Sequence, residues 1–441
     1  MKRLLPLLLC AVLALFCATT AQAAGVSITL TASEYALHYA FDAGAQDPFV
    51  ILEYATPAEK GWMMLYSEDG HFEGDVSLAY SGAGGKTSVA LTSARTTGSI
   101  GKASTTLPKA ADYQKPTGKS NAKVTDFVLT ETPEGFHYAF NAAGTDYMLL
   151  YWRSKEQTVT QPVYPDENGH YEGDVVSELT FARTQFTVQV KSGSGSMKKE
   201  ATVRKGYQVP EAPQRQEGRL SGVTVCIDAG HQENGRFVNE PIGPGLSGST
   251  SGKGGMAQGT KTNRRESIVC LEIGMLLRDE LLRQGANVVM TREDQTTFHT
   301  NIERCEIAEA GGAQIMLRLH CNNSSNRSKR GIQVYGPLNS DYAKAVADAD
   351  TYREMGQKLL DAMKTRVGMT LANSTGMVRL NDNYVGNNWA KMMCFLVEMG
   401  YLSNPAEEYL LVTPVYQQWL AEGMADGVYE IAVARGWVQA Q

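Results

Sequence analysis

A duplication in the first half of the chain restricts that half to a fold that can occur twice in tandem. His38-Tyr39-Ala40-Phe41 recurs as residues 137–140, and the segment Gly-His-Phe-Glu-Gly-Asp-Val at residues 70–76 recurs with one change at residues 169–175. Both recurrences have the same offset of 99 residues, so no net insertion separates the two motifs. Self-similarity at a fixed spacing is the signature of a repeated structural unit.

Each copy has the pattern of an all-β unit. Apolar residues alternate with polar ones in short runs, as in strands with one buried face. In the second copy they are Phe127 and Leu129, then Phe136, Tyr138 and Phe140. The pairs Asp69-Gly70 and Asn168-Gly169 suit tight hairpin turns. We therefore predict two β-sandwich repeats of immunoglobulin or fibronectin type, at residues 24–108 and 123–207.

Polar segments that contain proline, at residues 109–122 and 208–219, are the predicted linkers. The repeats contain four histidines, which are His38, His71, His137 and His170. These histidines invite a metal hypothesis, but a duplicated sequence also duplicates its structural residues, and we interpret them as structural. The partner of the β repeats stays unknown at this stage.

The first 23 residues have the features of a secretory signal. Lys2 and Arg3 precede the apolar run at residues 4–18, and Ala21-Gln22-Ala23 fits the small-residue rule for cleavage. The run is shorter than the roughly 20 residues that a membrane-spanning helix needs. We predict cleavage after Ala23 and a secreted protein with no membrane span in the mature chain.

Charge and cysteine content exclude some classes of protein. The chain has 41 basic and 47 acidic side chains, and loss of Lys2 and Arg3 leaves 39 and 47, a net charge of −8. Such a balance argues against nucleic-acid binding, which needs clustered basic residues. Two of the seven cysteines leave with the signal. The other five lie at no zinc-finger spacing, mostly within apolar runs, and we interpret them as buried apolar residues, with one disulfide left open.

From about residue 220 the pattern changes to alternating strands and helices. This alternation predicts a mostly parallel, twisted sheet covered by helices on both faces, at residues 220–441. The strands are predicted at residues 223–228, 288–290, 315–319, 332–335 and 395–397. The helices are predicted at residues 266–282, 302–310, 342–363 and 416–434.

Four polar residues of this half stand where such a sheet gathers its ligands. His231 follows the first strand, Glu266 opens a helix, and His320 and Glu398 each close a strand. The carboxyl ends of parallel strands meet at one edge, so these side chains are expected to converge. Two imidazoles and a carboxylate are a ligand set for Zn²⁺ with an open position, and a further carboxylate can handle protons. The pattern therefore suggests a secreted hydrolase.

Each of these residues also has a structural interpretation when it is taken alone. Glu398 could pair with Arg292 or Arg304, and Glu266 could be a first-turn acid favoured by the helix dipole. Rival carboxylates occur at Glu233, Glu240 and Asp294, and we interpret His299 as structural.

Residues 223–433 resemble the zinc-dependent N-acetylmuramoyl-L-alanine amidases, enzymes that cut peptidoglycan. The matching motifs, in order, are Ile227-Asp228-Ala229-Gly230-His231, Glu266, Thr291-Arg292, Arg304 with Ala308, Leu319-His320-Cys321-Asn322, and residues 398–405. The resemblance implies that His231, Glu266 and His320 bind zinc and that Glu398 is the catalytic acid/base. The chain departs from the family pattern at Ala229, Arg318 and Cys321. Arg318 could bind substrate or face an acid, and the sequence does not decide between them.

The resemblance implies cleavage of the amide between N-acetylmuramic acid and L-alanine, by an enzyme that is associated with the cell wall. A zinc peptidase that cuts within the stem peptide and a non-catalytic wall-binding protein are the alternatives. Asp228 and Asn322 are predicted to orient an imidazole by a hydrogen bond to the ring nitrogen that does not bind the metal. The long segment rich in Gly and Ser at residues 232–263 is predicted to form a mobile wall of the substrate groove.

Overall fold

The computed structural model describes residues 19–22, 25–78, 81–96, 98–111, 122–132, 135–145, 147–154, 158–176, 184–192, 195–205, 209–232, 238–250, 255–368 and 378–440. The signal segment predicted at residues 1–23 lies outside these residues, apart from the short strand β1 (Thr19–Gln22), which pairs with β2. Of the predicted linker at 109–122, residues 112–121 also lie outside them. Both predictions therefore stay predictions.

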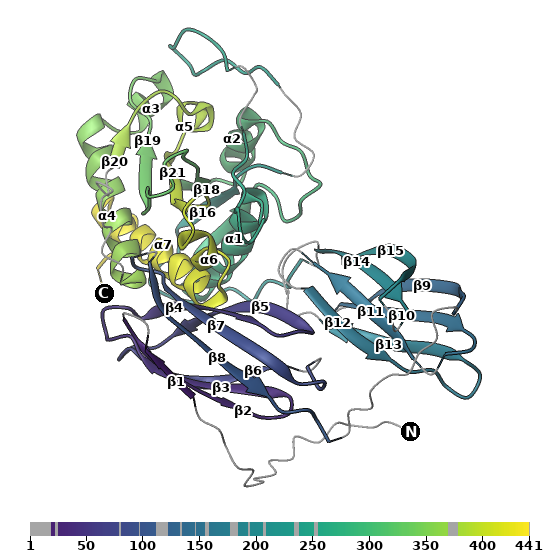
Figure 1. The fold of residues 1–441 in the computed structure, drawn as a ribbon. Helices are drawn as coiled ribbons and strands as arrows, with labels where there is room; N and C mark the ends of the chain where they lie inside the picture. The colour runs from purple at the N-terminus through teal and green to yellow at the C-terminus, as the bar shows by residue number, and fades with distance from the viewer. Residues whose placement is uncertain are drawn as a thin grey trace.

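The first copy of the duplicated segment forms two antiparallel sheets packed face to face (Figure 1). One sheet has the order β2-β3-β6, with β1 beside β2. Its strands are β2 (Ser27–Ala32), β3 (Ala36–Asp42) and β6 (His71–Ser77). The other has the order β5-β4-β7-β8, with β4 (Phe49–Ala55), β5 (Glu59–Tyr66), β7 (Gly85–Ser93) and β8 (Ser99–Leu107). Inward-facing side chains such as Leu30, Phe41 and Leu91 fill the space between the sheets.

The second copy repeats this strand order. Its first sheet is β13-β10-β9, made of β9 (Val124–Thr132), β10 (Gly135–Ala142) and β13 (His170–Val176). Its second sheet has the order β12-β11-β14-β15, with β11 (Met148–Arg153), β12 (Thr158–Val163), β14 (Thr184–Lys191) and β15 (Met197–Lys205). The all-β character predicted from the alternation agrees with these strands.

One detail of the prediction is wrong. Asp69-Gly70 and Asn168-Gly169 do occupy turns, in which Gly70 and Gly169 have φ of 82° and 78°. However, the strands that flank each turn belong to different sheets, so neither turn closes a hairpin. The two larger sheets also join, because β12 pairs with β5, and together they form one eight-stranded sheet.

The C-terminal half contains a six-stranded sheet of order β17-β16-β18-β21-β19-β20. Its strands are β16 (Thr224–Ala229), β17 (Asn287–Met290), β18 (Ile315–Asn322), β19 (Gln333–Gly336), β20 (Val378–Leu380) and β21 (Met393–Tyr401). The neighbours pair in parallel, except that β19 and β21 are antiparallel. Four of the five pairings are therefore parallel, and the antiparallel pairing of β19 with β21 makes the sheet mixed.

Helices cover both faces of this sheet. Successive residues of a strand point to opposite faces, so each strand contributes side chains to a core on either side. Val225 and Ile227 belong to a large core with helices α1 (Glu266–Arg283), α4 (Ala349–Val367) and α7 (Pro414–Ala434). Cys226 points the other way, into a smaller core with α2 (Asn301–Ala310) and the end of α5 (Val385–Trp389). All five cysteines of this half are buried and free, as expected from their place in apolar runs.

The helix predicted at residues 342–363 is in fact two helices, α3 (Asp341–Val346) and α4. Ala347 is extended, and the Asp348 side chain caps α4 by accepting a hydrogen bond from the Thr351 N–H. A carboxylate at this position satisfies a backbone donor that the first turn of a helix leaves free, and so it favours a new start.

The first repeat packs directly on the C-terminal half (Figure 1). Phe49 of β4 is 2% exposed and lies edge-on to Tyr416 and Trp419 of α7, at centroid distances of 5.9 and 5.2 Å. Trp62 of β5 packs edge-on to Tyr409 of the short helix α6 (Glu407–Leu410) at 4.7 Å. These aromatic side chains bury apolar surface in one continuous core that spans the two units.

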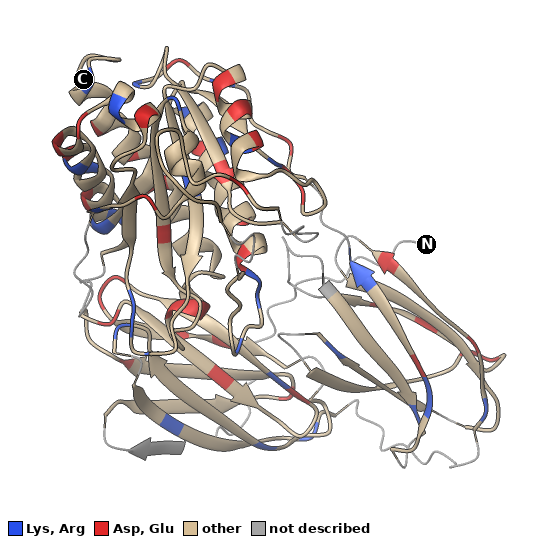
Figure 2. Ribbon diagram, turned by 90° about the horizontal axis from the view of Figure 1, so that it is seen from above, with Lys and Arg blue, Asp and Glu red and all other residues tan. Residues whose placement is uncertain are grey.

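Charged side chains of both signs are interspersed over the helices and strands of the molecule (Figure 2). Within the described part of the chain, none of the helices combines the length and the apolar character needed to cross a bilayer.

Truncation of Phe49 is expected to loosen the first repeat from the C-terminal half. Phe49→Ala removes a buried ring between β4 and α7, a change that typically costs about 3–5 kcal/mol. Backbone hydrogen exchange should then rise in α6, in the first turns of α7 and in β5, with little change in the second repeat.

The matched control is Met148→Ala, at the position of the second copy that corresponds to Phe49. Met148 is buried within the core of its own repeat. Its truncation should raise exchange in β9–β15 and leave α7 unaffected. Equal effects of both variants on α7 would show that Phe49 does not hold the contact.

Candidate metal centre

The parallel strands bring three of the four predicted site residues to one edge of the sheet. His320 on β18 and Glu398 on β21 are direct partners in the strand register. Both strands run on for two or three residues beyond them, so neither residue closes its strand as predicted. His231 lies two residues beyond β16, and Glu266 is the first residue of α1.

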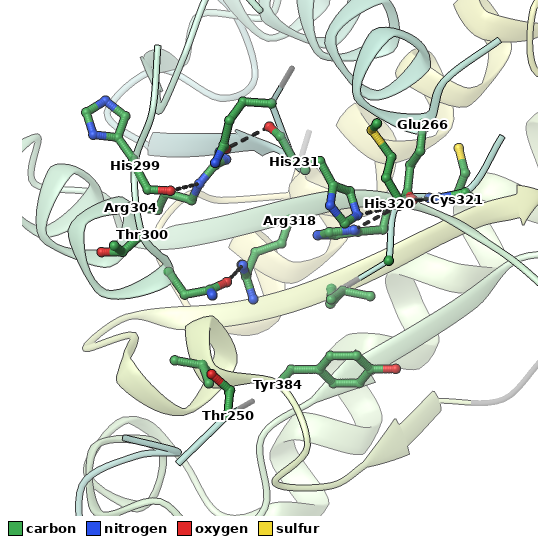
Figure 3. Close-up of a pocket in the computed structure, with 18 of the residues that line it drawn as sticks. His231, Thr250, Glu266, His299, Thr300, Arg304, Arg318, His320, Cys321 and Tyr384 are labelled. Atoms are coloured by element: carbon green, nitrogen blue, oxygen red, sulfur yellow. Dashed lines mark hydrogen bonds and ion pairs between the residues drawn. The ribbon is translucent and has the colours of Figure 1, made fainter. Parts of the chain in front are cut away.

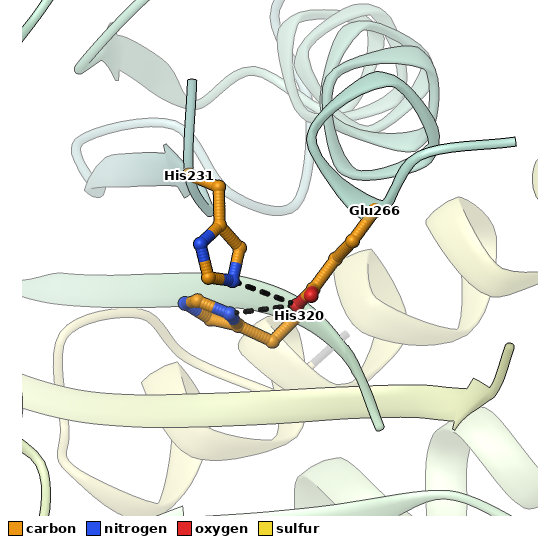
Figure 4. Close-up of side chains that lie close together, drawn as sticks. All are labelled: His231, Glu266 and His320. Atoms are coloured by element: carbon orange, nitrogen blue, oxygen red, sulfur yellow. Dashed lines mark hydrogen bonds and ion pairs between the residues drawn. The ribbon is translucent and has the colours of Figure 1, made fainter. Parts of the chain in front are cut away.

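Both imidazoles point at the carboxylate of Glu266 (Figure 4). His231 Nε2 lies 3.1 Å and His320 Nδ1 lies 3.0 Å from Glu266 Oε1. The two rings are nearly perpendicular, at 78°, with centroids 4.9 Å apart. Taking one nitrogen from each imidazole and one carboxylate oxygen, the three atoms all lie within 4.8 Å of one another. Among the described residues, this is the one group of His, Cys, Asp and Glu with such compact donor atoms.

The turn at His231 has an unusual backbone conformation, and the glycine before it allows close packing. His231 has φ of 57°, in the left-handed region that non-glycine residues rarely adopt. A Cβ atom on Gly230 would lie 2.5 Å from the Leu319 carbonyl oxygen and 2.6 Å from His320 Cε1. Glycine at this position therefore lets the turn pack directly against the ring of His320.

Two buried arginines hold the carbonyl groups of this turn. Arg292 donates from Nε to the Ala229 oxygen at 2.8 Å and from Nη2 to the Gly230 oxygen at 2.9 Å. Arg304 donates from Nη2 to the His231 oxygen at 3.1 Å. Three successive carbonyls are thus fixed by guanidinium groups, whose rigid planar arrangement of donors suits the task.

Glu266 is fixed by backbone donors as well as by the imidazoles. It is 3% exposed and accepts hydrogen bonds from the Cys321 N–H at 3.0 Å and the Ala257 N–H at 2.7 Å. Burial raises the pKa of Glu266, but the hydrogen bonds and charges of His231 and His320 outweigh it and hold the pKa well below its usual range. Burial lowers the pKa of His320, against a smaller opposing effect of Glu266, which favours the neutral imidazole.

Glu398 has the opposite electrostatic environment. Burial, and then the negative charge of Glu266, raise the pKa of Glu398 to about 8. Its Oε2 atom is buried and has no hydrogen-bond partner among the described residues, and the same holds for His320 Nε2. Buried polar atoms are usually hydrogen-bonded. These two atoms without a partner lie beside the possible metal ligands, and they indicate a place for a ligand.

All four residues line one cavity of about 720 Å³ (Figure 3). In this view His231, Glu266 and His320 lie together, with His299 and Thr300 towards one end and Tyr384 and Thr250 across the opening. A cavity of this size is in the range of small-molecule sites.

The described parts of the segment at residues 232–263 form a wall of this cavity, as predicted. They contribute Val238, Glu240, Thr250, Met256 and Ala257, whereas residues 233–237 and 251–254 lie outside the described residues. Glu240 accepts hydrogen bonds from the backbone N–H groups of Asn301 and Ile302, at the start of α2. The predicted mobility of the segment stays a prediction.

Arg318 faces an acid, one of the two possibilities that the sequence left open, and it also lines the cavity. Its Nε donates to Asp228 Oδ2 at 2.9 Å, and its Nη2 donates to Asn301 Oδ1 at 2.7 Å. Asp228 is fully buried and also accepts from Arg304 and from the Thr291 hydroxyl. Burial raises the pKa of Asp228, but the charges of Arg304 and Arg318 outweigh it, so the carboxylate stays ionised.

The prediction that Asp228 and Asn322 orient an imidazole is wrong. Asp228 pairs with the two arginines, and Asn322 donates from Nδ2 to Gln333 Oε1 at 3.1 Å. The rival carboxylates have other contacts. Glu240 caps α2, Asp294 accepts from Thr296 and Thr297, and Glu233 lies outside the described residues.

Some cavity residues had no signal in the sequence. Tyr384, Phe298 and Asn301 line the cavity from short connections and helix starts, where no periodic pattern exists. His299, interpreted as structural, also lines it, and its backbone oxygen accepts from Arg304 Nε at 3.3 Å.

Known proteins resemble this half of the chain. Residues 225–430 match the N-acetylmuramoyl-L-alanine amidase family. A germination-specific N-acetylmuramoyl-L-alanine amidase of Bacillus subtilis is 26% identical over 231 residues, which cover 49% of this chain and 83% of the relative. A probable cell wall amidase of Staphylococcus aureus is 27% identical over 238 residues, which cover 52% of this chain and 72% of the relative.

Two solved structures are similar as well. The N-acetylmuramoyl-L-alanine amidase of Clostridium difficile 630 is 24% identical, with a TM-score of 0.38 over 48% of this chain and 96% of that chain. The amidase Ami1 of Mycobacterium abscessus is 21% identical, with a TM-score of 0.44 over 48% of this chain and 99% of that chain. The family match spans all four predicted site residues, and residues 225–430 form a domain of the N-acetylmuramoyl-L-alanine amidase family.

Proposed function

We propose that this chain is an exported, zinc-dependent enzyme that hydrolyses the amide bond between N-acetylmuramic acid and L-alanine in peptidoglycan. One observation carries the proposal. Two imidazoles and a carboxylate converge in a cavity that also contains a buried second carboxylate, within a domain of this family. The names of the two relatives, one a germination-specific amidase and the other a probable cell wall amidase, support peptidoglycan as the substrate. The signal features at residues 1–23 support export.

The donor atoms fit Zn²⁺, with His231, Glu266 and His320 as the proposed ligands. Zinc in catalytic sites is usually bound by three protein groups drawn from imidazole nitrogens and carboxylate oxygens. When bound there, Zn²⁺ would supply an open coordination position that acidifies a water molecule and polarises a carbonyl oxygen. The depressed pKa values of Glu266 and His320 favour the deprotonated forms that can act as ligands.

Glu398 is the proposed general base and general acid. A carboxyl group whose pKa is raised to about 8 can exchange a proton near neutral pH. It would take a proton from the water that attacks the amide carbonyl. It would then deliver that proton to the nitrogen of L-alanine as the carbon–nitrogen bond breaks. No serine or cysteine nucleophile is needed for this sequence.

Two other functions would be compatible with the same fold. A zinc peptidase that cuts within the stem peptide could use the same zinc ligands, because these ligands do not determine whether the substrate contains a sugar. A wall-binding protein could use the cavity for recognition alone. The products of digestion and the effect of removing Glu398 separate all three functions.

Glu398→Gln is expected to reduce the hydrolysis of purified peptidoglycan by about 10²–10⁴-fold, the usual contribution of a general acid/base. Mass spectrometry of the wild-type digest should find stem peptides that begin with L-alanine. The control is Glu293→Gln, which changes an exposed carboxylate that does not line the cavity and should retain activity. Stem peptides cut internally would favour the peptidase, and undiminished lysis by Glu398→Gln would remove Glu398 from the mechanism.

The same variant should change how the stability of the metal-free protein depends on pH. The pKa of Glu398 is about 8 in the folded chain, above its ordinary value of 4.5. The stability that this group contributes is therefore fully present below pH 4.5 and is lost as the pH rises to about 8. Glu398→Gln lacks this loss, so its stability relative to wild type should rise across that window. Urea unfolding with a chelator at several pH values measures the difference, and a constant difference would contradict the raised pKa.

Asp228→Asn should weaken both folding and metal binding. It leaves Arg304 and Arg318 buried without their counter-charge, a loss that typically costs about 3–5 kcal/mol. Because Arg304 also holds the His231 carbonyl, the affinity for Zn²⁺ in a chelator competition should fall. Asp361→Asn on the exposed side of α4 is the control, and it should cost less than about 1 kcal/mol. An unchanged zinc affinity in Asp228→Asn would separate the ion-pair network from the metal centre.

A further inference from the structure

The outer faces of the two small sheets carry a repeated set of imidazoles and carboxylates. Four of the seven histidines of the chain lie here, two in each repeat. In the first repeat the register of β3 and β6 places His38 opposite Asp75, Ala40 opposite Glu73 and Asp42 opposite His71. These side chains are on the solvent side, because the alternate residues Tyr39, Phe41 and Phe72 are the ones that fill the core.

The contacts within this set are directional. His38 Nδ1 lies 3.1 Å from Asp75 Oδ1, and His71 Nδ1 lies 2.6 Å from Asp42 Oδ1. The opposite nitrogens face one shared carboxylate between them. His38 Nε2 is 3.3 Å from Glu73 Oε1, and His71 Nε2 is 3.6 Å from Glu73 Oε2.

This arrangement is typical of imidazoles prepared to bind a metal. A neutral imidazole that donates its Nδ1–H to a carboxylate presents a lone pair at Nε2, and metal-binding histidines are commonly oriented in this way. Here each Nε2 atom faces an oxygen of Glu73, so the contact needs either a second proton on the imidazole or a metal cation between the two atoms. Three carboxylates surround two imidazoles, and the outward positions of β2, β3 and β6 contain no Lys or Arg.

The second repeat has a related arrangement, with one substitution and with the central Glu172 facing His170 rather than both imidazoles. His137 Nδ1 lies 2.9 Å from Asp174 Oδ1, and His170 Nε2 lies 3.7 Å from Glu172 Oε2. Asn141 stands where the first repeat has Asp42, and its Oδ1 lies 2.8 Å from His170 Nδ1. Its Nδ2 donates to Asp126 Oδ2 at 2.9 Å. In the second repeat the carboxylate is therefore that of Asp126 on the neighbouring strand β9, and the amide of Asn141 connects it to the imidazole of His170.

Packing in the core does not explain why the exposed histidines and carboxylates of the small sheets recur in both repeats. We interpreted the four histidines as structural, but they lie on the solvent face, where side chains have little effect on stability. The strands of the two large sheets share almost no residues between the copies, whereas β3 and β6 retain both histidines, Glu73 and Asp75 together with core residues such as Tyr39 and Phe41.

We propose that each repeat binds a divalent transition-metal cation on this face. The ligands would be the imidazoles and the central glutamate, which are His38, His71 and Glu73 in the first repeat and His137, His170 and Glu172 in the second. Imidazole and carboxylate donors suit Zn²⁺ and related ions. The two Nε2 atoms lie on either side of the glutamate, so binding requires exposed side chains to rotate inwards, and the affinity will be lower than at the compact centre of the amidase domain. The proposal does not depend on the proposed enzymatic function.

The test is the zinc content of the whole exported chain after equilibrium dialysis against buffered Zn²⁺. Wild type should bind one equivalent in the amidase domain and one in each repeat. The double variant His38→Gln with His137→Gln should lose the two equivalents of the repeats. Glu266→Gln should lose only the equivalent of the amidase domain, so failure at one kind of site is distinguishable from failure at the other.

The matched control is Thr31→Val with Thr130→Val. These residues lie at corresponding positions of β2 and β9, opposite His38 and His137, and Val has no donor atom. The control should bind as much zinc as wild type. A single equivalent in wild type, or full retention by the double histidine variant, would overturn the proposal. So would imidazole NMR signals of the repeats that titrate with pH but do not respond to Zn²⁺.

Discussion

The candidate metal centre depends on a buried ion-pair network in which the carboxylate of Asp228 neutralises the guanidinium groups of Arg304 and Arg318. Each of these groups would be costly alone in a medium of low dielectric constant, and their mutual attraction with well-placed hydrogen bonds makes burial tolerable. Arg304 uses the same guanidinium to bind the carbonyl of His231, which has a positive φ. The network and the turn that presents the first imidazole are therefore one structure.

Two carboxylates that line the same cavity are driven to opposite protonation behaviour by their contacts. Glu266 accepts two backbone hydrogen bonds and faces two imidazoles, and its pKa is depressed. Glu398 is buried with one oxygen unpaired among the described residues, and its pKa is raised to about 8. Groups whose environments separate their pKa values in this way are suited to different roles. A permanently ionised Glu266 suits a ligand, and a Glu398 that can exchange protons suits an acid and base.

The sequence predicted the elements that have strong periodicity and could not predict the contacts between them. The apolar runs of β16, β18 and β21 marked the sheet edge, and this is why His231, His320 and Glu398 could be expected together. The partner of Asp228 could not be predicted, because nearness in sequence to His231 says nothing about the face on which a strand residue lies. Asp228 shares the face of Cys226, towards α2 and Arg304. Tyr384 could not be predicted either, since it stands in a short connection without a pattern.

The duplicated unit is used in two different ways by the same chain. Phe49 and Met148 occupy corresponding positions, yet Phe49 packs into the core of the C-terminal half and Met148 into the core of its own repeat. The first repeat also contacts the loop between β18 and β19. Arg330 donates to the Ala94 oxygen at 3.1 Å, and the next residue, Gly331, donates to Glu407, which also accepts from the Tyr401 N–H at the end of β21. Because β21 carries Glu398, the docked repeat belongs to the support of the site, whereas the second repeat joins the molecule through the β12–β5 pairing and its linker.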